Sequence, residues 1–195
     1  MAKEKMAKEK TEAADIIQSL ERLTRLMRAG EHEGGLNPAQ WEALRYLARA
    51  NRFSDSPGAL TRFLGSTKGT VSQTLKSLER KGMIVKSRRV NEKRSVCLEL
   101  TDSARDTLRT DPLKAFTKSV DDLNGKTKRR LAKGLRELLE TELARQKQPS
   151  FGTCSSCRYF REKGRDEGRH GPHACMLFEA GLTAEEATLI CVAHS

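Results

Sequence analysis

The chain lacks the long apolar segments of membrane and secreted proteins. No apolar run approaches the roughly 20 residues that a membrane-spanning helix requires. The N-terminus is a charged repeat, MAKEKMAKEK, and has no apolar signal core. We therefore expect a cytoplasmic protein with no membrane partner. In that compartment its five cysteines are expected to be reduced and are more apt to bind metal than to form disulfides.

The sequence also lacks the patterns of common enzyme classes. It has no Ser/His/Asp set and no glycine-rich phosphate loop. Its one C-x-x-C does not start a helix after a strand, as a thioredoxin-like site would require. A thiol or iron-sulfur redox enzyme is therefore the least favoured alternative, and we expect no enzyme.

Positive charge is abundant but unevenly placed. The 195 residues include 37 Lys and Arg against 26 Asp and Glu, a formal net charge of +11. Residues 149–195 carry five basic and six acidic side chains, so residues 1–148 hold the whole basic excess, +12. Segregated positive charge favours a polyanion partner, because each neutralised phosphate releases condensed counterions.

The stretch 57–101 combines two helical segments with two short strands. Apolar residues recur at helical spacing in both segments, and a short turn separates them. Thr67 is placed to cap the second helix, and Gly82 to end it with a left-handed residue. The period then changes to strands over 83–85 and 96–100 around a basic run. This order predicts a mainly α fold with a small β wing, a winged helix-turn-helix.

The phrases TVSQTLKSLERKGMI and RSVCLELTDSARDTL resemble the recognition helix, wing and following helix of the MarR family of transcription regulators. The resemblance covers residues 13–143. It implies a helical homodimer in which the first and last long helices of two subunits interlock. Such a dimer predicts a pseudo-palindromic operator in double-stranded DNA, with half-sites about 10 base pairs apart. Where the family has Asp-x-Arg at the wing tip, this chain has Glu92-Lys93-Arg94, and Arg94 is expected to reach the groove.

The predicted recognition helix carries short polar and basic side chains opposite its apolar stripe. Gln73 is the candidate for reading a base edge, since an amide can hydrogen-bond adenine bidentately. Neighbouring basic and hydroxyl side chains would clamp phosphates, and arginines of the hairpin suit the adjacent minor groove. The candidate DNA-binding residues are Thr67, Lys68, Thr70, Ser72, Gln73, Thr74, Lys76, Arg88, Arg89, Lys93 and Arg94.

Helical patterns precede the winged helix. The repeat at 1–10 is expected to be disordered or frayed, because nothing apolar anchors it. From 11 to 30 an apolar stripe predicts a helix that forms dimer surface. Asn37 and Pro38 are typical of a helix start, and Trp41 is expected in the core. A cleft near this helix can hold phenolic ligands in the family that the chain resembles.

A further helical pattern follows the wing. After a short capped helix and a break at Pro112, apolar residues recur from 116 to 147 mostly at threes and fours. The pattern predicts one long, one-sided helix that needs a partner. Pairing with the same region and the N-terminal helix of a second subunit is the symmetrical solution.

Four of the five cysteines lie in the last 47 residues, with little apolar material around them. So small a core favours a metal staple. Thr183 and Glu186 form a capping box that predicts a short helix ending at the last cysteine. Cys97 is expected to be a buried cysteine of the wing. The candidate metal ligands are Cys154, Cys157, Cys175 and Cys191.

The spacing of these cysteines leaves two metals open. Structural zinc usually takes its cysteines as two knuckles, and this tail has one. A C-x-x-C with two isolated cysteines is compatible with a 2Fe-2S or 4Fe-4S iron-sulfur cluster, which we favour over zinc. His170, His173 and His194 are alternative ligands, although each is expected to be a surface residue.

These features divide the chain into a repeat over 1–10, a winged-helix and dimerisation domain over 11–148, and a metal-binding module over 149–195. The expected function is sequence-specific DNA binding by a transcription regulator, a repressor, modulated by an iron-sulfur cluster that senses iron, oxygen or redox state. The signal is expected to pass through the helix before the module and alter the spacing of the two recognition helices. The alternative keeps the regulator but has a structural zinc site and a small phenolic effector.

Overall fold

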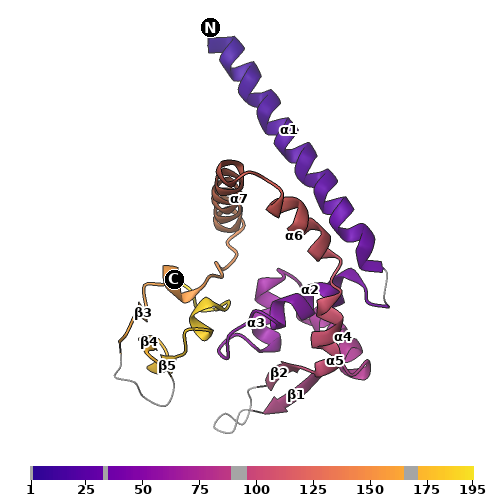
Figure 1. Ribbon diagram of the computed structural model, residues 1–195, viewed down its shortest axis with the longest axis vertical. Helices are drawn as coiled ribbons and strands as arrows, with labels where there is room; N and C mark the ends of the chain where they lie inside the picture. The colour runs from indigo at the N-terminus through magenta and orange to yellow at the C-terminus, as the bar shows by residue number, and fades with distance from the viewer. Residues whose placement is uncertain (1, 33–34, 89–95, 165–170) are drawn as a thin grey trace.

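The computed structural model describes residues 2–32, 35–88, 96–164 and 171–195 and is mainly helical (Figure 1). Its α-helices are α1 (Ala2–Ala29), α2 (Pro38–Leu47), α3 (Pro57–Phe63), α4 (Lys68–Arg80), α5 (Asp102–Arg109), α6 (Leu113–Asp121) and α7 (Gly125–Arg145). Its strands are β1 (Ile84–Arg88), β2 (Val96–Leu100), β3 (Phe160–Arg161), β4 (His173–Cys175) and β5 (Ala180–Leu182). Short 3-10 turns are η1 (Gly30–His32), η2 (Cys154–Ser156) and η3 (Glu186–Thr188).

The helices α2 to α5 and the β1–β2 hairpin form one packed unit, residues 36–111, which we call the body. Its apolar side chains make a single cluster that excludes water, and burial of this area is the main stabilising term. Trp41 lies in that cluster, as predicted, with 2% of its surface exposed. The buried residues are Leu36, Trp41, Ala43, Leu44, Tyr46, Leu47, Ala59, Leu60, Val71, Leu75, Leu78, Ile84, Leu98 and Ala104.

The helix boundaries of the body follow from side-chain caps. The Asn37 side chain accepts a hydrogen bond from the Gln40 amide, and the Gln40 side chain accepts from the Asn37 amide, a complete capping box. Thr67 caps α4 by accepting from the Thr70 amide at 3.1 Å. Gly82 follows α4 with φ +67°, the left-handed conformation expected of it. These predictions from the sequence are confirmed.

Helix α1 projects away from the body and ends far from it at the N-terminus (Figure 1). Its helix includes residues 2–10, the repeat that was expected to be disordered or frayed. Ala, Lys and Glu have high helix propensity, and continuation from 11–29 removes the cost of nucleation. Within the described segments, no helix is long and apolar enough to cross a membrane.

The predicted long helix over 116–147 is broken in two. Helix α6 ends at Asp121, and α7 begins at Gly125 after Asn124, whose side chain accepts from the Thr127 amide at 3.0 Å. An N-cap inside the predicted helix starts a new helix, because its own backbone is extended. The pair Asn124-Gly125 indicates this break in the sequence, but the apolar periodicity continues across it.

Residues 149–195 form a small unit with a three-stranded antiparallel sheet in the order β3-β4-β5, which we call the cysteine module. It lies beside α3 and the loop between α2 and α3 (Figure 1). The predicted capping box is present, since Glu186 N donates to Thr183 Oγ1 and Thr183 N donates to Glu186 Oε2. The helix expected after it is only the 3-10 turn η3, and Cys191 follows in extended backbone.

Candidate functional site

Helix α4 turns its polar face to solvent. Val71, Leu75 and Leu78 are buried against the body. Thr74 is half-buried and donates its hydroxyl proton to Thr70 O at 3.1 Å. The remaining candidates of this helix and its cap are exposed: Thr67, Lys68, Thr70, Ser72, Gln73 and Lys76.

The body holds α4 in a fixed position. Gln40 Nε2 of α2 donates to Ser77 Oγ of α4 at 2.9 Å. Lys81, just after α4, donates to Gln40 Oε1 at 3.2 Å and to Gly35 O. A helix anchored on one face and polar on the other can enter a groove without rearrangement, which is the requirement for base readout.

The wing is tied to both α4 and the α2–α3 loop. Its strands pair antiparallel from Ile84 opposite Leu100 to Arg88 opposite Val96. Lys86 Nζ forms a 2.5 Å ion pair with Glu79 of α4. Arg88 is exposed at the outer end of β1. The other wing candidates, Arg89, Lys93 and Arg94, lie outside the described residues.

Backbone hydrogen bonds and strand pairing connect the segments that carry the four cysteines of the module. Cys157 N donates to Cys154 O at 2.9 Å, which closes the C-x-x-C turn. Cys191 N donates to Gly152 O at 2.9 Å, two residues before that turn. Cys175 pairs with Phe160 across the β3–β4 ladder. Cys154 and Cys191 are buried, and Cys157 and Cys175 are half-buried.

The Cys154 thiol is buried and lies near other ionisable groups. Burial first, and then Cys191, Cys157 and Cys175, together raise the pKa of this thiol to about 11. All five cysteines of the chain are free. The neighbouring thiols raise the pKa of Cys154 because two thiolates repel each other. In the part of the chain that the structure describes, no group of three or more His, Cys, Asp or Glu side chains has an arrangement that could hold a metal ion.

The histidines and Cys97 have other surroundings. His173 Nδ1 accepts from Lys163 N at 3.3 Å, and its ring lies 5.2 Å from that of Phe160. His194 Nε2 lies 2.9 Å from Ser156 Oγ, inside the C-x-x-C turn. His170 lies outside the described residues. Cys97 is buried in β2, as predicted.

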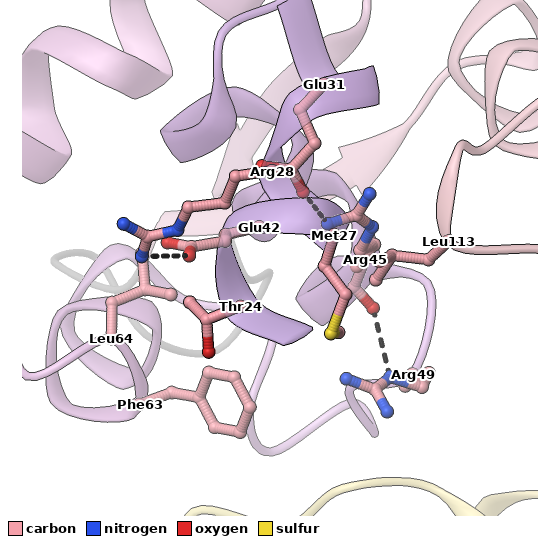
Figure 2. A pocket seen from close by; sticks show the side chains of 10 residues that line it. All are labelled: Thr24, Met27, Arg28, Glu31, Glu42, Arg45, Arg49, Phe63, Leu64 and Leu113. Carbon is pink, nitrogen blue, oxygen red and sulfur yellow. Dashed lines mark hydrogen bonds and ion pairs between the residues drawn. The ribbon is translucent and has the colours of Figure 1, made fainter. Parts of the chain in front are cut away.

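A cavity of about 410 Å³ opens where α1, α2, α3 and α6 meet (Figure 2). The family resemblance implied only a cleft near the helix that carries Trp41. The lining residues could not be predicted, because the walls come from segments far apart in the chain. Its lining combines apolar and charged side chains: Thr24, Met27, Arg28, Glu31, Glu42, Arg45, Arg49, Phe63, Leu64 and Leu113.

Arg45 is the centre of charge in this cavity. It donates to Asp111 at 2.6 and 2.8 Å and also to Glu31. Burial alone would raise the pKa of Asp111, but hydrogen bonds from Arg45 and the Leu113 amide outweigh it and lower that pKa. For Arg45, burial opposes the charge, and the two carboxylates restore it and raise the pKa. Among the described atoms, the second oxygen of Glu31 is buried with no hydrogen-bond partner.

Helices α1 and α7 expose apolar side chains that the chain itself does not cover. Ile17 is 60% and Leu139 57% exposed. Between the two helices lies an apolar groove of about 420 Å³. Its lining residues are Ala13, Ile16, Ile17, Arg130, Leu131, Gly134, Leu135 and Leu138.

Comparison with known proteins identifies the fold of this arrangement. Residues 34–95 match the family model described as the MarR family, over the helix-turn-helix and the wing. A MarR transcriptional regulator from Methanosarcina mazei Go1 is 20% identical, with a TM-score of 0.54, and the match covers 68% of this chain and 96% of that one. No curated protein sequence matches the chain.

Two further solved structures share the fold. Streptococcus pneumoniae FabT, in complex with DNA, is 24% identical with a TM-score of 0.52, over 68% of this chain and 93% of that one. The organohalide-sensing regulator RdhR-CbdbA1625, in its 2,4-dichlorophenol-bound form, is 20% identical with a TM-score of 0.51, over 69% and 81%. The predicted MarR-like winged-helix fold is therefore confirmed. Two of these three proteins are named as transcriptional regulators.

Proposed function

We propose that this protein is a DNA-binding transcription regulator of the MarR type that acts as a dimer. The observation that carries the proposal is the anchored helix α4, whose exposed face holds Lys68, Gln73 and Lys76 in a row of polar side chains. The basic excess of residues 1–148 and the DNA bound to FabT, a protein of the same fold, support it. We expect the regulator to repress transcription. Whether it represses or activates depends on where its operator lies relative to the promoter.

Salt-dependent DNA binding tests the role of α4. Lys76→Ala removes one phosphate contact, so it should weaken binding to any duplex and reduce the salt slope by about one. Lys133→Ala on α7 is the matched control, because Lys133 is equally charged, exposed and distant from α4. Fluorescence anisotropy on a labelled duplex, titrated with salt, measures both. Equal slopes for the two variants would contradict the proposal.

Base readout needs a specific site, which selection from a random duplex pool with the full-length protein supplies. Gln73→Ala should lose about 1–3 kcal/mol of discrimination at one base pair of the selected site. Its binding to unselected duplex should stay close to that of the wild type. An unchanged selected sequence for the variant would remove Gln73 from readout.

A second copy of the chain is the proposed cover of the α1 and α7 apolar faces. A lone helix pair with such faces is unstable in water, and a two-fold dimer buries both at once. Ile17→Asp should therefore give a particle of monomer mass in sedimentation equilibrium. Leu177→Asp is the control, since Leu177 is also exposed but lies in the cysteine module. A dimeric Ile17→Asp protein would refute this interface.

The cysteine module is proposed to hold an iron-sulfur cluster through Cys154, Cys157, Cys175 and Cys191, with zinc as the alternative. Two observations support the proposal: the four cysteines are free, and Cys157, Cys175 and Cys191 lie near enough to Cys154 to raise its pKa. When bound, such a centre would supply a signal that depends on iron, oxygen or redox state. Anaerobic purification followed by absorption spectroscopy and metal analysis tests it: visible bands indicate a cluster, equimolar zinc the alternative, and neither metal contradicts both.

A small phenolic effector is the second candidate signal, and the cavity around Arg45 favours it. The cavity combines apolar walls with arginines that suit a weakly acidic ring compound. Calorimetric titration with 2,4-dichlorophenol tests this. Arg49→Ala should weaken binding and Arg22→Ala should not, because Arg49 lines the cavity and Arg22 does not. No binding to the wild type would set this candidate aside.

A further inference from the structure

The cysteine module is joined by backbone hydrogen bonds to the loop between α2 and α3, residues 48–56. Asn51 N donates to Ile190 O at 3.0 Å, and Ile190 N donates to Arg49 O at 2.6 Å. Two residues later, Val192 N donates to Ser54 Oγ at 2.8 Å. Cys191 therefore sits inside a segment that is bound to the loop on both sides.

Side chains strengthen the same joint. The rings of Phe53 and Phe178 stack at a centroid distance of 4.1 Å and an angle of 7°. Arg52 pairs with Glu186 at 2.9 Å and donates to Gly181 O at 2.5 Å. Stacking, an ion pair and backbone bonds together fix the module on the loop in one orientation.

The same loop also contacts the proposed DNA-binding elements. Asp55 O accepts from Leu98 N of wing strand β2 at 2.7 Å. Ser56 caps α3, the first helix of the helix-turn-helix, by accepting from Ala59 N at 3.2 Å. The loop thus contacts the module, the wing and α3 within a few residues.

Buried hydrogen bonds cross-link the interior of the loop. Ser54 and Asn51 are buried, and Ser54 Oγ donates to Asn51 Oδ1 at 2.8 Å. Tyr46 OH donates to Ser54 O at 2.8 Å. Among the described atoms, Asn51 Nδ2 is buried without a hydrogen-bond partner. Because these bonds connect Asn51, Ser54 and α2, a displacement of Ser54 is passed on to its neighbours in the loop.

We propose that the α2–α3 loop is the relay through which the state of the cysteine module sets the position of the wing. This inference rests on the proposed function, since it names how a change at the cysteines would reach DNA. The sequence favoured a route through the helix preceding the module and the spacing between subunits. The contacts place a shorter route inside one subunit, from the segment around Cys191 to Leu98.

Hydrogen–deuterium exchange on the full-length protein tests the relay without DNA. Phe178→Ala removes the stack on Phe53 from the module side, and its site is 38% exposed, so the module should still fold. The variant should exchange severalfold faster in peptides covering 49–56 and also in those covering 96–100. Leu177→Ala is the matched control and should leave both unchanged. Faster exchange in 49–56 with an unchanged 96–100 would overturn the relay.

A second pair of variants repeats the test through charge. Glu186→Gln removes the ion pair with Arg52 but keeps a side-chain oxygen that can accept the capping hydrogen bond from Thr183 N. Glu185→Gln changes the adjacent exposed carboxylate and is the control. Spread of faster exchange to 96–100 with Glu186→Gln alone supports the relay. Identical exchange for the two variants contradicts it.

Duplex binding separates failure of the relay from failure of the proposed function. The affinity of the Phe178→Ala variant for a duplex should differ about fivefold from that of the wild type, within the usual range of coupling between sites. If Lys76→Ala weakens DNA binding while Phe178→Ala leaves both affinity and β2 exchange unchanged, the relay is wrong and the function stands. If the wild type binds no duplex, the function is wrong, and exchange in β2 still decides the relay.

Discussion

The body and the cysteine module are held together in different ways. The body encloses a continuous cluster of buried apolar side chains drawn from four helices and the wing. The buried cluster that the structure describes in the module consists of Cys154, Leu182 and Ala187, and one of its packing partners, Phe53, belongs to the body. The body has a large apolar cluster of its own, against which Phe151, Ile190 and Val192 of the module also pack, whereas the cluster of the module is small and includes a contact with the body.

The sensing role proposed for the module is consistent with that small cluster. A unit with little apolar burial has low intrinsic stability, so a bound ligand contributes a large share of its folding free energy. The body has a larger apolar core, so binding or loss of a ligand at the module should change its stability less. A difference in stability between two joined regions allows one to change state while the other stays folded.

Matched leucine truncations should give the largest effects and test the comparison directly. Leu60→Ala in α3 empties a fully buried site of the body and should lower its free energy of unfolding by about 2–5 kcal/mol. Leu182→Ala empties a site in β5 that is equally buried. Leu182→Ala should loosen the module. Apart from any loss of contacts between the module and the body, the free energy of unfolding of the body should stay within about 0.5 kcal/mol of the wild-type value.

The single tryptophan makes this measurement selective. Trp41 lies in the core of the body, so its fluorescence in a urea titration reports the body alone. Val85→Ala is the control for Leu60→Ala, because Val85 is about half exposed on β1. Equal losses in the Trp41 transition for Leu60→Ala and Leu182→Ala would mean that the two regions unfold as one.

The two joints of the body differ in acid sensitivity. The joint to α6 runs through Asp111, which forms a largely buried ion pair with Arg45 and accepts a hydrogen bond from Leu113 N of α6. The joint to the module includes the more exposed Arg52–Glu186 pair. Asp111→Asn should lower the free energy of unfolding at neutral pH by about 1.5–3 kcal/mol, the value of hydrogen bonds to charged groups. Because folding lowers the pKa of Asp111, its contribution is complete above pH 4 and disappears as pH falls through the folded pKa.

The difference between wild type and Asp111→Asn should therefore shrink as pH falls from 5 toward 2, measured by urea titration of Trp41 fluorescence. Glu186→Gln is the control, and an exposed pair of this kind contributes only about 0–1 kcal/mol. A difference that stays constant with pH would show that Asp111 acts through packing and not through its charge.

Local signals in the sequence were enough to predict the body. Caps at Asn37, Thr67 and Thr101, the left-handed Gly82, and apolar stripes at helical spacing each specify a boundary or a face, and the structure confirms them. Where periodicity was used alone, it failed. The apolar pattern continued across the cap at Asn124, and the break between α6 and α7 was missed.

The site was predictable where it lies on one element and not where it is assembled. The exposed face of α4 follows from helix geometry, so Gln73 and Lys76 were placed correctly on the surface. The cavity around Arg45 and the joint between Ser54 and Val192 bring together residues far apart in the chain. Residue spacing carries no direct information on such contacts, which depend on how whole elements pack.

A matched pair of glycines gives the smallest expected effect. Gly82 in the body and Gly171 in the module both have positive φ, +67° and +95°. A Cβ at Gly82 meets nothing within 4 Å, so Gly82→Ala should cost only the left-handed strain, about 1 kcal/mol in the Trp41 transition. A Cβ at Gly171 would lie 2.5 Å from Leu182 O, so Gly171→Ala adds a clash with backbone to the same strain.

Despite that clash, Gly171→Ala should shift the Trp41 transition less than Gly82→Ala, because the clash falls within the β4–β5 hairpin of the module. Its effect should appear as faster hydrogen exchange over residues 173–182. A larger shift in the Trp41 transition for Gly171→Ala would mean that the body relies on the module for stability as much as the module relies on the body.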